Sequence, residues 1–180
     1  MIRRCRNGDR NAFDQLIDKY QPVVLGTVRK MVLDPEDARD IVQNVFLKAY
    51  ENLDSFRTEM RFFSWLYRIA INETINFIES SKHRTRIEDE TPSASQTPEH
   101  EFDRAQLFLK IEAALAQLHP RTRALVVLRH YADLSYRELG FIFDTPEQTI
   151  KSRLYGARRV LARNLHEHGV SREDLSRTAG

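Results

Sequence analysis

Basic side chains gather on one predicted helix near the C-terminal end of the chain. Between Pro146 and Arg163 five positive residues stand against one acid, Glu147. Arginine and lysine form charge-assisted hydrogen bonds with phosphate, and arginine also binds guanine edges in the DNA major groove. The basic residues of this stretch are Lys151, Arg153, Arg158, Arg159 and Arg163. They indicate a DNA-binding helix, and the alternative is an ordinary amphipathic helix with a solvated charged face.

The elements that would position these side chains form a predicted helix-turn-helix over residues 134–161. Ser135 followed by Glu138 has the capping-box pattern of a helix start, and residues 143–145 break that first helix. Thr145 is the predicted cap of the second helix, with Pro146 in its first turn. Apolar residues recur at helical spacing on the side away from the charges: Leu139, Ile142, Ile150, Leu154, Ala157 and Leu161. This geometry places a basic second helix in a major groove.

A second stretch, residues 56–76, mixes aromatic rings with guanidinium and amide groups. Its aromatic residues are Phe56, Phe62, Phe63, Trp65 and Tyr67, and its polar partners are Arg57, Arg61, Arg68, Asn72 and Asn76. Unpaired bases stack on rings, while guanidinium groups hold phosphate and amides bind base edges. The stretch therefore suits single-stranded nucleic acid. Periodicity alone favours the alternative, in which most of these rings pack in a core.

Composition excludes several other classes of protein. The single cysteine, Cys5, rules out an internal disulfide framework and a cysteine-based zinc cluster and fits a reducing cytoplasm. The chain has no apolar run of membrane-spanning length and no glycine-rich phosphate loop. Six histidines are scattered, and the pair His166 and His168 diverges on a helix, so we expect no metal site. The formal net charge of +2 means that the basic helix is a local feature.

The predicted fold class is all-α, with two small helical domains joined by a flexible linker. The first domain spans residues 1–80, with helices expected over 11–31, 35–53 and 61–80; Pro22 is expected to kink or divide the first of these. Asp34 is the predicted cap of the second helix, whose expected apolar stripe is Ile41, Val42, Val45, Phe46, Ala49, Tyr50 and Leu53. Residues 81–101 are too polar to order themselves and form the linker. The second domain spans residues 102–165 and ends in the helix-turn-helix. A polar tail follows over 166–180, and the chain is expected to fray after Arg163.

Four stretches of the chain resemble a bacterial RNA polymerase sigma factor of the extracytoplasmic-function group. They are, in chain order, GDRNAFDQLIDKYQPVV, DPEDARDIVQNVFLKAYENLDSF, FFSWLYRIAINETINFI and LSYRELGFIFDTPEQTIKSRLYGARRVL. Together they cover most of both predicted domains with the family's order and spacing. The resemblance implies a promoter-specificity subunit that is not an enzyme and that has no catalytic residue, no metal and no cofactor.

The resemblance also implies three sets of site residues. The duplex-contacting set for the minus-thirty-five element is Lys151, Ser152, Arg153, Tyr155, Arg158 and Arg159, of which Arg158 or Arg159 is expected to be a surface charge only. The set that captures unpaired bases of the minus-ten element is Phe56, Ser64, Trp65, Tyr67, Arg68, Asn72 and Asn76. The set that binds core polymerase is Asp37, Asp40, Gln43, Asn44 and Phe46. Core packing is the alternative for Trp65 and the favoured role for Phe46. Gly156 departs from the family, in which a larger and often basic residue is common.

The partners implied by the resemblance are core RNA polymerase, promoter DNA and an anti-sigma factor. On polymerase, the contacts would be the clamp helices of the largest subunit and the flap region, and the protein would act in the cytoplasm without membrane insertion. The competing hypothesis is a self-contained helix-turn-helix regulator whose first domain senses a ligand or forms a dimer. The aromatic and basic helix over 61–80 favours the sigma factor, because a reader of duplex DNA alone has no use for stacking surfaces.

Overall fold

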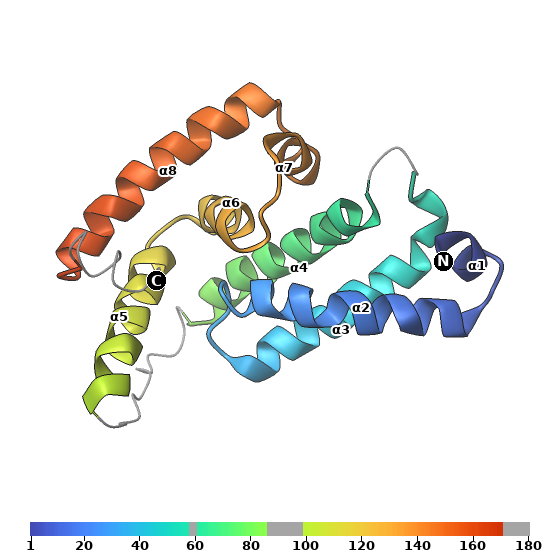
Figure 1. The fold of residues 1–180 in the computed structure, drawn as a ribbon, viewed down its shortest axis with the longest axis horizontal. Helices are drawn as coiled ribbons and strands as arrows, with labels where there is room; N and C mark the ends of the chain where they lie inside the picture. The colour runs from blue at the N-terminus through green and yellow to red at the C-terminus, as the bar shows by residue number, and fades with distance from the viewer. Residues whose placement is uncertain (58–60, 86–98, 171–180) are drawn as a thin grey trace.

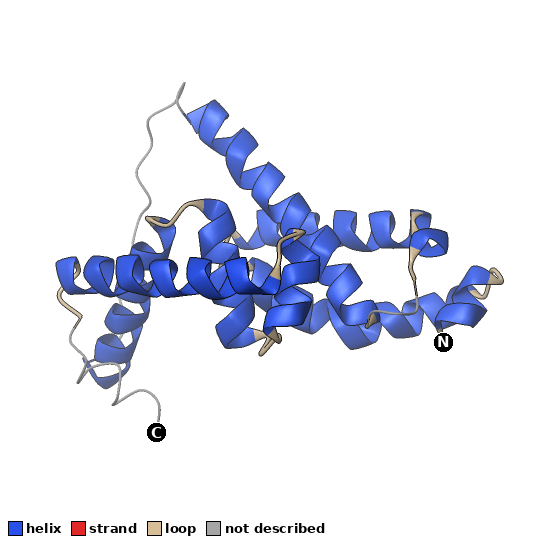
Figure 2. Cartoon of the chain, turned by 90° about the horizontal axis from the view of Figure 1, so that it is seen from above, coloured by secondary structure: helices blue, strands red, loops and turns tan. Residues whose placement is uncertain are grey.

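A computed structural model describes residues 1–57, 61–85 and 99–170, and every regular element in these ranges is helical (Figures 1 and 2). The elements are α1 (Ile2–Arg6), α2 (Arg10–Val28), α3 (Pro35–Glu51), the 3₁₀ turn η1 (Leu53–Ser55), α4 (Phe62–Thr85), α5 (Glu99–Ala116), α6 (Pro120–Tyr131), α7 (Tyr136–Phe143) and α8 (Glu147–Glu167). Helices α2, α3 and α4 pack together as the first domain, and α5 to α8 form the second. The all-α prediction with two helical domains is confirmed.

Two helix starts form as their sequences predict. The Asp34 carboxylate accepts hydrogen bonds from the backbone N–H groups of Glu36 and Asp37, at 2.7 and 3.2 Å, and so caps α3. At α7 the capping box is complete. The Glu138 backbone N–H donates to the Ser135 hydroxyl at 3.2 Å, and the Ser135 backbone N–H donates to the Glu138 carboxylate at 2.9 Å.

Pro22 lies inside α2, which runs as one helix through that position instead of splitting into two abutting helices. A proline in a helix interior removes one backbone hydrogen bond and costs about 3 kcal/mol. Burial on both sides of the proline offsets this cost: Phe13 and Leu16 lie in the core before it, and Val24 and Val28 after it. Each large apolar side chain that is fully buried contributes about 1.5–3 kcal/mol. Tertiary packing therefore decides the length of α2.

The turn between α7 and α8 corrects one detail of the predicted helix-turn-helix. Asp144 adopts the left-handed conformation (φ 50°, ψ 53°) and ends α7, but Thr145 does not cap α8. The Thr145 hydroxyl instead donates back to the Phe143 carbonyl at 3.0 Å, and Pro146 is the N-cap residue of α8. Gly140 makes this turn possible, because a Cβ at that position would lie 2.8 Å from the Thr145 carbonyl oxygen.

The helices that flank the predicted linker are longer than expected. Helix α4 continues to Thr85 and α5 begins at Glu99, so both ends of the 81–101 segment are helical. The rest of the predicted linker, residues 86–98, lies outside the described residues.

The expectation that the chain frays after Arg163 is wrong for the described part of the tail, because α8 continues to Glu167. The Asn164 side chain is buried and its amide donates to the Ala114 carbonyl of α5 at 3.1 Å, while Val170 is also buried. Residues 171–180 lie outside the described residues.

The two domains pack against each other along α4, which contacts α2 and α3 on one side and α6 and α7 on the other (Figure 1). The buried side chains form one hydrophobic cluster that extends through both domains. Leu66 and Tyr67 of α4, Leu128 of α6 and Leu139 of α7 are among its most deeply buried members. Polar contacts also cross the boundary; in one of them Arg123 Nε of α6 donates to the Lys30 carbonyl at 3.0 Å.

Candidate nucleic-acid interface

Helix α8 exposes every residue of the predicted duplex-contacting set. The exposed side chains are Lys151, Ser152, Arg153, Tyr155, Arg158 and Arg159. The opposite side of the helix is buried, with Ile150, Leu154 and Ala157 packed in the core of the second domain. Tyr155 is 67% exposed, which is unusual for a large aromatic residue in a folded protein and common at a contact surface. The amphipathic pattern therefore leaves one accessible, positively charged face.

Two of these groups already have partners within the chain. Lys151 Nζ lies 3.0 Å from a carboxylate oxygen of Glu147 and 5.4 Å from the centre of the Tyr136 ring. Arg153 donates to the Thr145 hydroxyl at 3.3 Å, at the N-terminal end of α8. These contacts are exposed, so each contributes little free energy. They orient the side chains, and a phosphate or a base can replace the present partners.

The two adjacent arginines differ in their surroundings. Burial lowers the pKa of His130 on α6, and the charge of Arg158 lowers it further, which places Arg158 at the side of α8 that faces α6. Arg159 follows Ser152 and Tyr155 at helical spacing, so these three lie in one row on the outer face. If one of the two arginines is only a surface charge, this geometry favours Arg158.

Gly156 lies in the same outer region of α8, and nothing in its packing requires a glycine. A Cβ built at Gly156 has no atom within 4 Å. A glycine in the middle of a helix costs about 0.5–1 kcal/mol relative to alanine. The larger side chain that many family members carry at this position is therefore not excluded by a clash within the chain.

Helix α4 presents a second accessible row of predicted residues. Trp65, Asn72 and Asn76 follow one another at intervals of seven and four residues, so they lie on one side of the helix, with Ile69 between them. Asn72 and Asn76 are exposed, and Trp65 and Ile69 are half-buried. An aromatic ring followed by two amides on one face is suited to stacking one base and hydrogen-bonding the edges of others.

The four other members of the predicted minus-ten set pack against other parts of the protein. Phe56 and Tyr67 lie in the hydrophobic core, where the Tyr67 hydroxyl is 2.7 Å from that of Thr27. Ser64 is completely buried, and the guanidinium carbon of Arg68 lies 5.3 Å from the centre of the Phe141 ring on α7. Phe56 and Tyr67 are thus packing residues in this structure, whereas Ser64 and Arg68 lie at the boundary with α7.

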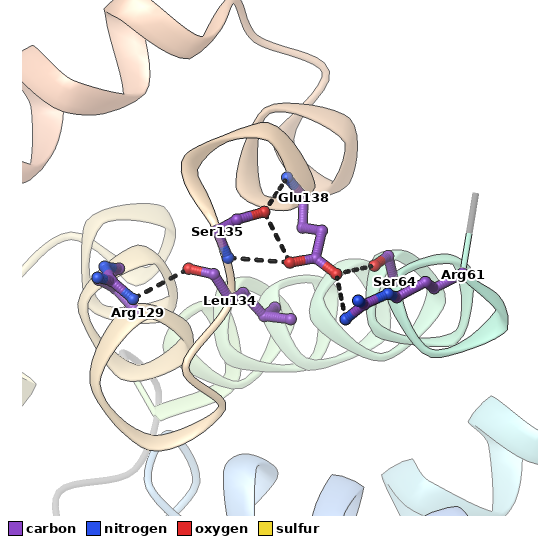
Figure 3. Close-up of polar contacts among 6 residues, drawn as sticks. All are labelled: Arg61, Ser64, Arg129, Leu134, Ser135 and Glu138. Atoms are coloured by element: carbon purple, nitrogen blue, oxygen red, sulfur yellow. Dashed lines mark hydrogen bonds and ion pairs between the residues drawn. The ribbon is translucent and has the colours of Figure 1, made fainter. Parts of the chain in front are cut away.

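One carboxylate organises that boundary (Figure 3). Glu138, which completes the capping box of α7, also accepts a hydrogen bond from the Ser64 hydroxyl at 3.3 Å and lies 3.5 Å from a guanidinium nitrogen of Arg61. Burial acts to raise the pKa of Glu138, but the hydrogen bonds from Ser135 and Ser64 and the charge of Arg61 outweigh it and lower the pKa overall. The carboxylate is therefore held ionised between α7 and α4.

The outer face of α3 carries the predicted polymerase-binding residues. Asp40, Gln43 and Asn44 are exposed, Asp37 is half-buried, and Phe46 is buried, in agreement with its favoured core role. Beside them lies an apolar hollow of about 320 Å³, lined by Phe13, Ile17, Gln21, Val42, Gln43, Phe46, Leu47 and Tyr50. Polar side chains and an open apolar hollow thus share one face.

Sequence comparison identifies both halves of this arrangement. Residues 16–84 match the family described as Sigma-70 region 2, and residues 108–161 match the family described as Sigma-70, region 4. The RNA polymerase sigma-H factor of Pseudomonas aeruginosa is 31% identical over 177 residues, which cover 92% of each chain. This chain belongs to the sigma-70 family.

Further relatives assign this sigma factor to the extracytoplasmic-function group. An extracytoplasmic-function sigma-E factor of Haemophilus influenzae is 31% identical over 89% of this chain and 91% of its own length. The factor SigW of Bacillus subtilis is 30% identical over 92% of this chain and 95% of its own length. The protein is therefore a transcription initiation factor that directs RNA polymerase to promoters.

Solved structures show the same fold. CnrH, solved in complex with the cytosolic domain of CnrY, superimposes with a TM-score of 0.69 at 21% identity and covers 92% of this chain and 95% of that chain. The sigma factor RpoE of Bartonella quintana, solved with the anti-sigma factor NepR, gives a TM-score of 0.67 at 23% identity, with coverage of 86% and 97%.

The region 2 match covers most of α2, all of α3 and nearly all of α4, and the region 4 match runs from within α5 to within α8. The sequence analysis did not identify Leu47 of α3 as a surface residue, but its side chain is 56% exposed. Tyr50 was expected in the buried apolar stripe of the same helix, but its side chain is 46% exposed. The helical spacing of α3 could have predicted the exposure of Leu47, because Leu47 lies three and four positions after Asn44 and Gln43 on the polar side of the helix. The role of Glu138 at the domain boundary had no clue beyond its capping box.

Among the described residues, no helix is long and apolar enough to span a membrane, and no three metal-binding side chains come together. His168, part of the histidine pair of the tail, has its Nε2 atom 2.9 Å from the Gln117 amide nitrogen.

Proposed function

We propose that this sigma factor binds core polymerase through α3, reads the minus-thirty-five element as duplex with α8 and captures unpaired minus-ten bases along α4. The main support is the accessible face of α8, on which all six predicted contact residues are exposed and the apolar residues are turned away. Such a helix fits a major groove, and its positive groups supply the phosphate contacts that orient it.

Roles on α8 divide along the helix. Lys151, Ser152 and Arg153 lie in its N-terminal half and contact base edges, with Tyr155 beside them. Arg159, farther along the outer row, contacts phosphate, and Arg158 adds charge at the flank. Gly156 leaves the middle of this face without a side chain.

The minus-ten element is bound by the row on α4. The half-buried ring of Trp65 offers a stacking surface, and Asn72 and Asn76 hydrogen-bond the edges of unpaired bases. Extruding a base from a duplex costs a few kcal/mol, and stacking on an aromatic ring returns about 1–3 kcal/mol per base. Ser64 and Arg68 join this surface when α7 moves away, while Phe56 and Tyr67 support it from the core.

Reading both elements requires the two domains to separate. The named elements are about 25 base pairs apart, which corresponds to roughly 85 Å of duplex at 3.4 Å per base pair. Helix α4, which contacts α7 directly, has 24 residues and is only about 36 Å long. The packed arrangement therefore belongs to the protein away from promoter DNA, and the boundary around Glu138 opens when polymerase and promoter are bound.

The α3 face binds the clamp helices of the largest polymerase subunit. Exposed Leu47 and Tyr50 and the apolar hollow supply the hydrophobic centre of this contact, and Asp40, Gln43 and Asn44 supply its polar rim. The second domain contacts the flap region. Because it acts with polymerase, the protein works in the cytoplasm. An anti-sigma factor is a further partner, since the structural neighbour RpoE was solved with the anti-sigma factor NepR, and such a factor would hold the two domains in their packed form.

Run-off transcription with purified core polymerase on a library of genomic promoters tests this function. The sigma factor should produce defined transcripts only when core polymerase is present. The competing hypothesis, a self-contained helix-turn-helix regulator, predicts tight and specific binding to duplex DNA by the protein alone and no transcript start that depends on it.

A further inference from the structure

Arg6 is the last residue of α1. Its side chain donates hydrogen bonds to three backbone carbonyl groups in the segment between α3 and α4. Its Nε and Nη2 atoms donate to the Leu53 carbonyl at 3.2 and 3.1 Å. Nη2 also donates to the Asp54 carbonyl at 3.3 Å and to the Phe56 carbonyl. All three carbonyls belong to η1 or to the residue that ends it.

Two of the three carbonyls, those of Asp54 and Phe56, lie beyond the one that closes the turn, because the Phe56 backbone N–H donates to the Leu53 carbonyl at 3.2 Å. The last carbonyls of a short 3₁₀ turn lie beyond its own hydrogen-bond ladder. A guanidinium group is suited to them, because it presents several N–H donors in a fixed planar fork, whereas a lysine ammonium is a compact point charge. Arg6 therefore fixes the direction in which the chain leaves η1.

The backbone of Arg6 is held in place by the packing of α1. The preceding residue, Cys5, is 5% exposed and belongs to the hydrophobic core, and α1 packs against α2 and η1. Residues 16–84 match the region 2 family, so α1 and Arg6 lie outside the matched segment. The match to the region 2 family therefore does not include this contact.

The segment held by Arg6 contacts, through Phe56, the proposed base-stacking surface of α4. The Phe56 ring packs edge-on against Phe62 and Trp65, with ring centres 5.6 and 5.5 Å apart, and Phe62 lies 5.5 Å from Trp65. Phe56 is 4% exposed, so its ring is the inner support of the half-buried Trp65. One residue thus receives the Arg6 hydrogen bond through its carbonyl and supports Trp65 through its ring.

We infer that Arg6 is a positioning residue for promoter melting. It holds η1 and Phe56 so that the Trp65 ring keeps the orientation on which an unpaired base stacks. Arg6 acts through Phe56 and makes no contact with DNA. The inference rests on the proposed minus-ten role of α4, but the support of Trp65 by Arg6 is a property of the free protein.

Trp65 is the only tryptophan of the chain, so its fluorescence reports on this cluster directly. The variants are Arg6→Ala, Arg6→Lys and, as the matched control, Arg3→Ala, which removes the same charge from an exposed position of the same helix. Acrylamide quenching is measured on the free proteins. Initial promoter binding and open-complex formation are then measured with the holoenzymes.

Arg6→Ala and Arg6→Lys should both make Trp65 more accessible to acrylamide, whereas Arg3→Ala should behave like wild type. Open-complex formation should fall about tenfold in both Arg6 variants, the change expected for loss of one charge-assisted hydrogen bond. Initial binding to duplex promoter should stay unchanged, which separates this role from general attraction to DNA.

The inference is overturned if Arg6→Lys melts promoters as well as wild type, or if Arg3→Ala is as defective as Arg6→Ala, because charge alone would then explain the effect. Unchanged quenching in the Arg6 variants would also overturn it. If Arg6→Ala does not fold, the same measurements are made on Arg6→Lys and Arg6→Gln, which keep part of the set of N–H donors. Wild-type promoter melting or wild-type quenching in these variants would overturn the inference. If wild type itself does not melt promoters, the proposed function fails, and the quenching comparison still tests the support of Trp65.

Discussion

The Ser64 hydroxyl donates a hydrogen bond to the Glu138 carboxylate at 3.3 Å, and this contact joins α4 to α7. The same carboxylate caps α7 through Ser135 (Figure 3). Glu138 therefore links the local structure of the helix-turn-helix to the packing of the two domains.

Removing the Ser64 hydroxyl should favour the separated form of the domains. Ser64→Ala leaves a side chain of similar size and removes one hydrogen bond, worth about 1 kcal/mol or about a fivefold change in population. Small-angle X-ray scattering should report a larger radius of gyration for Ser64→Ala. Ser80→Ala is the control, because Ser80 is exposed on the same helix and its hydroxyl donates to the Phe77 carbonyl within that helix. Identical scattering from Ser64→Ala and wild type would remove this contact from domain packing.

Acid should weaken the same boundary. The pKa of Glu138 is lowered in the folded protein, so its contribution to stability is present above the ordinary glutamate value of about 4.3 and is lost as pH falls through the folded-state value. The free energy of unfolding of wild type should therefore approach that of Glu138→Gln as pH falls below about 5. A constant difference between the two proteins from pH 7 to pH 3 would show that this carboxylate is not held ionised by its partners.

The exposed apolar residue of α3 should matter for polymerase binding. Leu47 is 56% exposed beside an apolar hollow, and truncating a central apolar contact of an interface costs about 1–2 kcal/mol. Leu47→Ala should weaken the affinity for core polymerase about tenfold while thermal unfolding stays at the wild-type temperature. Leu109→Ala, at a 60% exposed leucine of α5, is the matched control. Equal affinities of the two variants would place the polymerase contact elsewhere.

Arg153 should contribute to recognition of the minus-thirty-five element. If it contacts a base, Arg153→Ala costs about 1–3 kcal/mol and relaxes specificity at one position. If it contacts phosphate, the variant weakens all sequences alike and lowers the salt dependence of binding. Titrations of the holoenzyme with single-position variants of the element, at several salt concentrations, separate the two cases. Wild-type affinity throughout would exclude Arg153 from the interface.

Sequence patterns that involve residues close together in the chain, such as helix caps and apolar spacing, predicted the local structure correctly. The capping box of Ser135 and Glu138, the cap at Asp34 and the buried face of α8 are formed as expected, because each involves residues within one or two helical turns. The position of the break after α7 was also predictable. The identity of the next cap was not, because the Thr145 hydroxyl has two backbone groups within reach and bonds the preceding carbonyl.

Features that depend on distant parts of the chain were not predictable. Nothing near Arg6 in the sequence points to carbonyls 47 to 50 residues away. Asn164 appeared to belong to a polar tail and instead donates to α5. Trp65 and Tyr67 are two positions apart and therefore lie on opposite sides of α4, but the aromatic pattern did not show that Tyr67 packs on α2 and that Trp65 remains half-buried. Side-chain exposure at the domain boundary is set by tertiary packing, which local patterns do not record.

The central claim, that α4 captures unpaired bases, is tested most directly by Asn72→Ala. Asn72 is exposed, so its loss should leave the fold and its stability unchanged, and Asn11→Ala is the control at an exposed asparagine of α2. Losing a base-edge hydrogen bond costs about 1–3 kcal/mol. The measurement compares open-complex formation with initial promoter binding for the holoenzymes. We predict that Asn72→Ala binds duplex promoter like wild type and forms about tenfold fewer open complexes. Open-complex formation equal to that of wild type and Asn11→Ala would contradict the account.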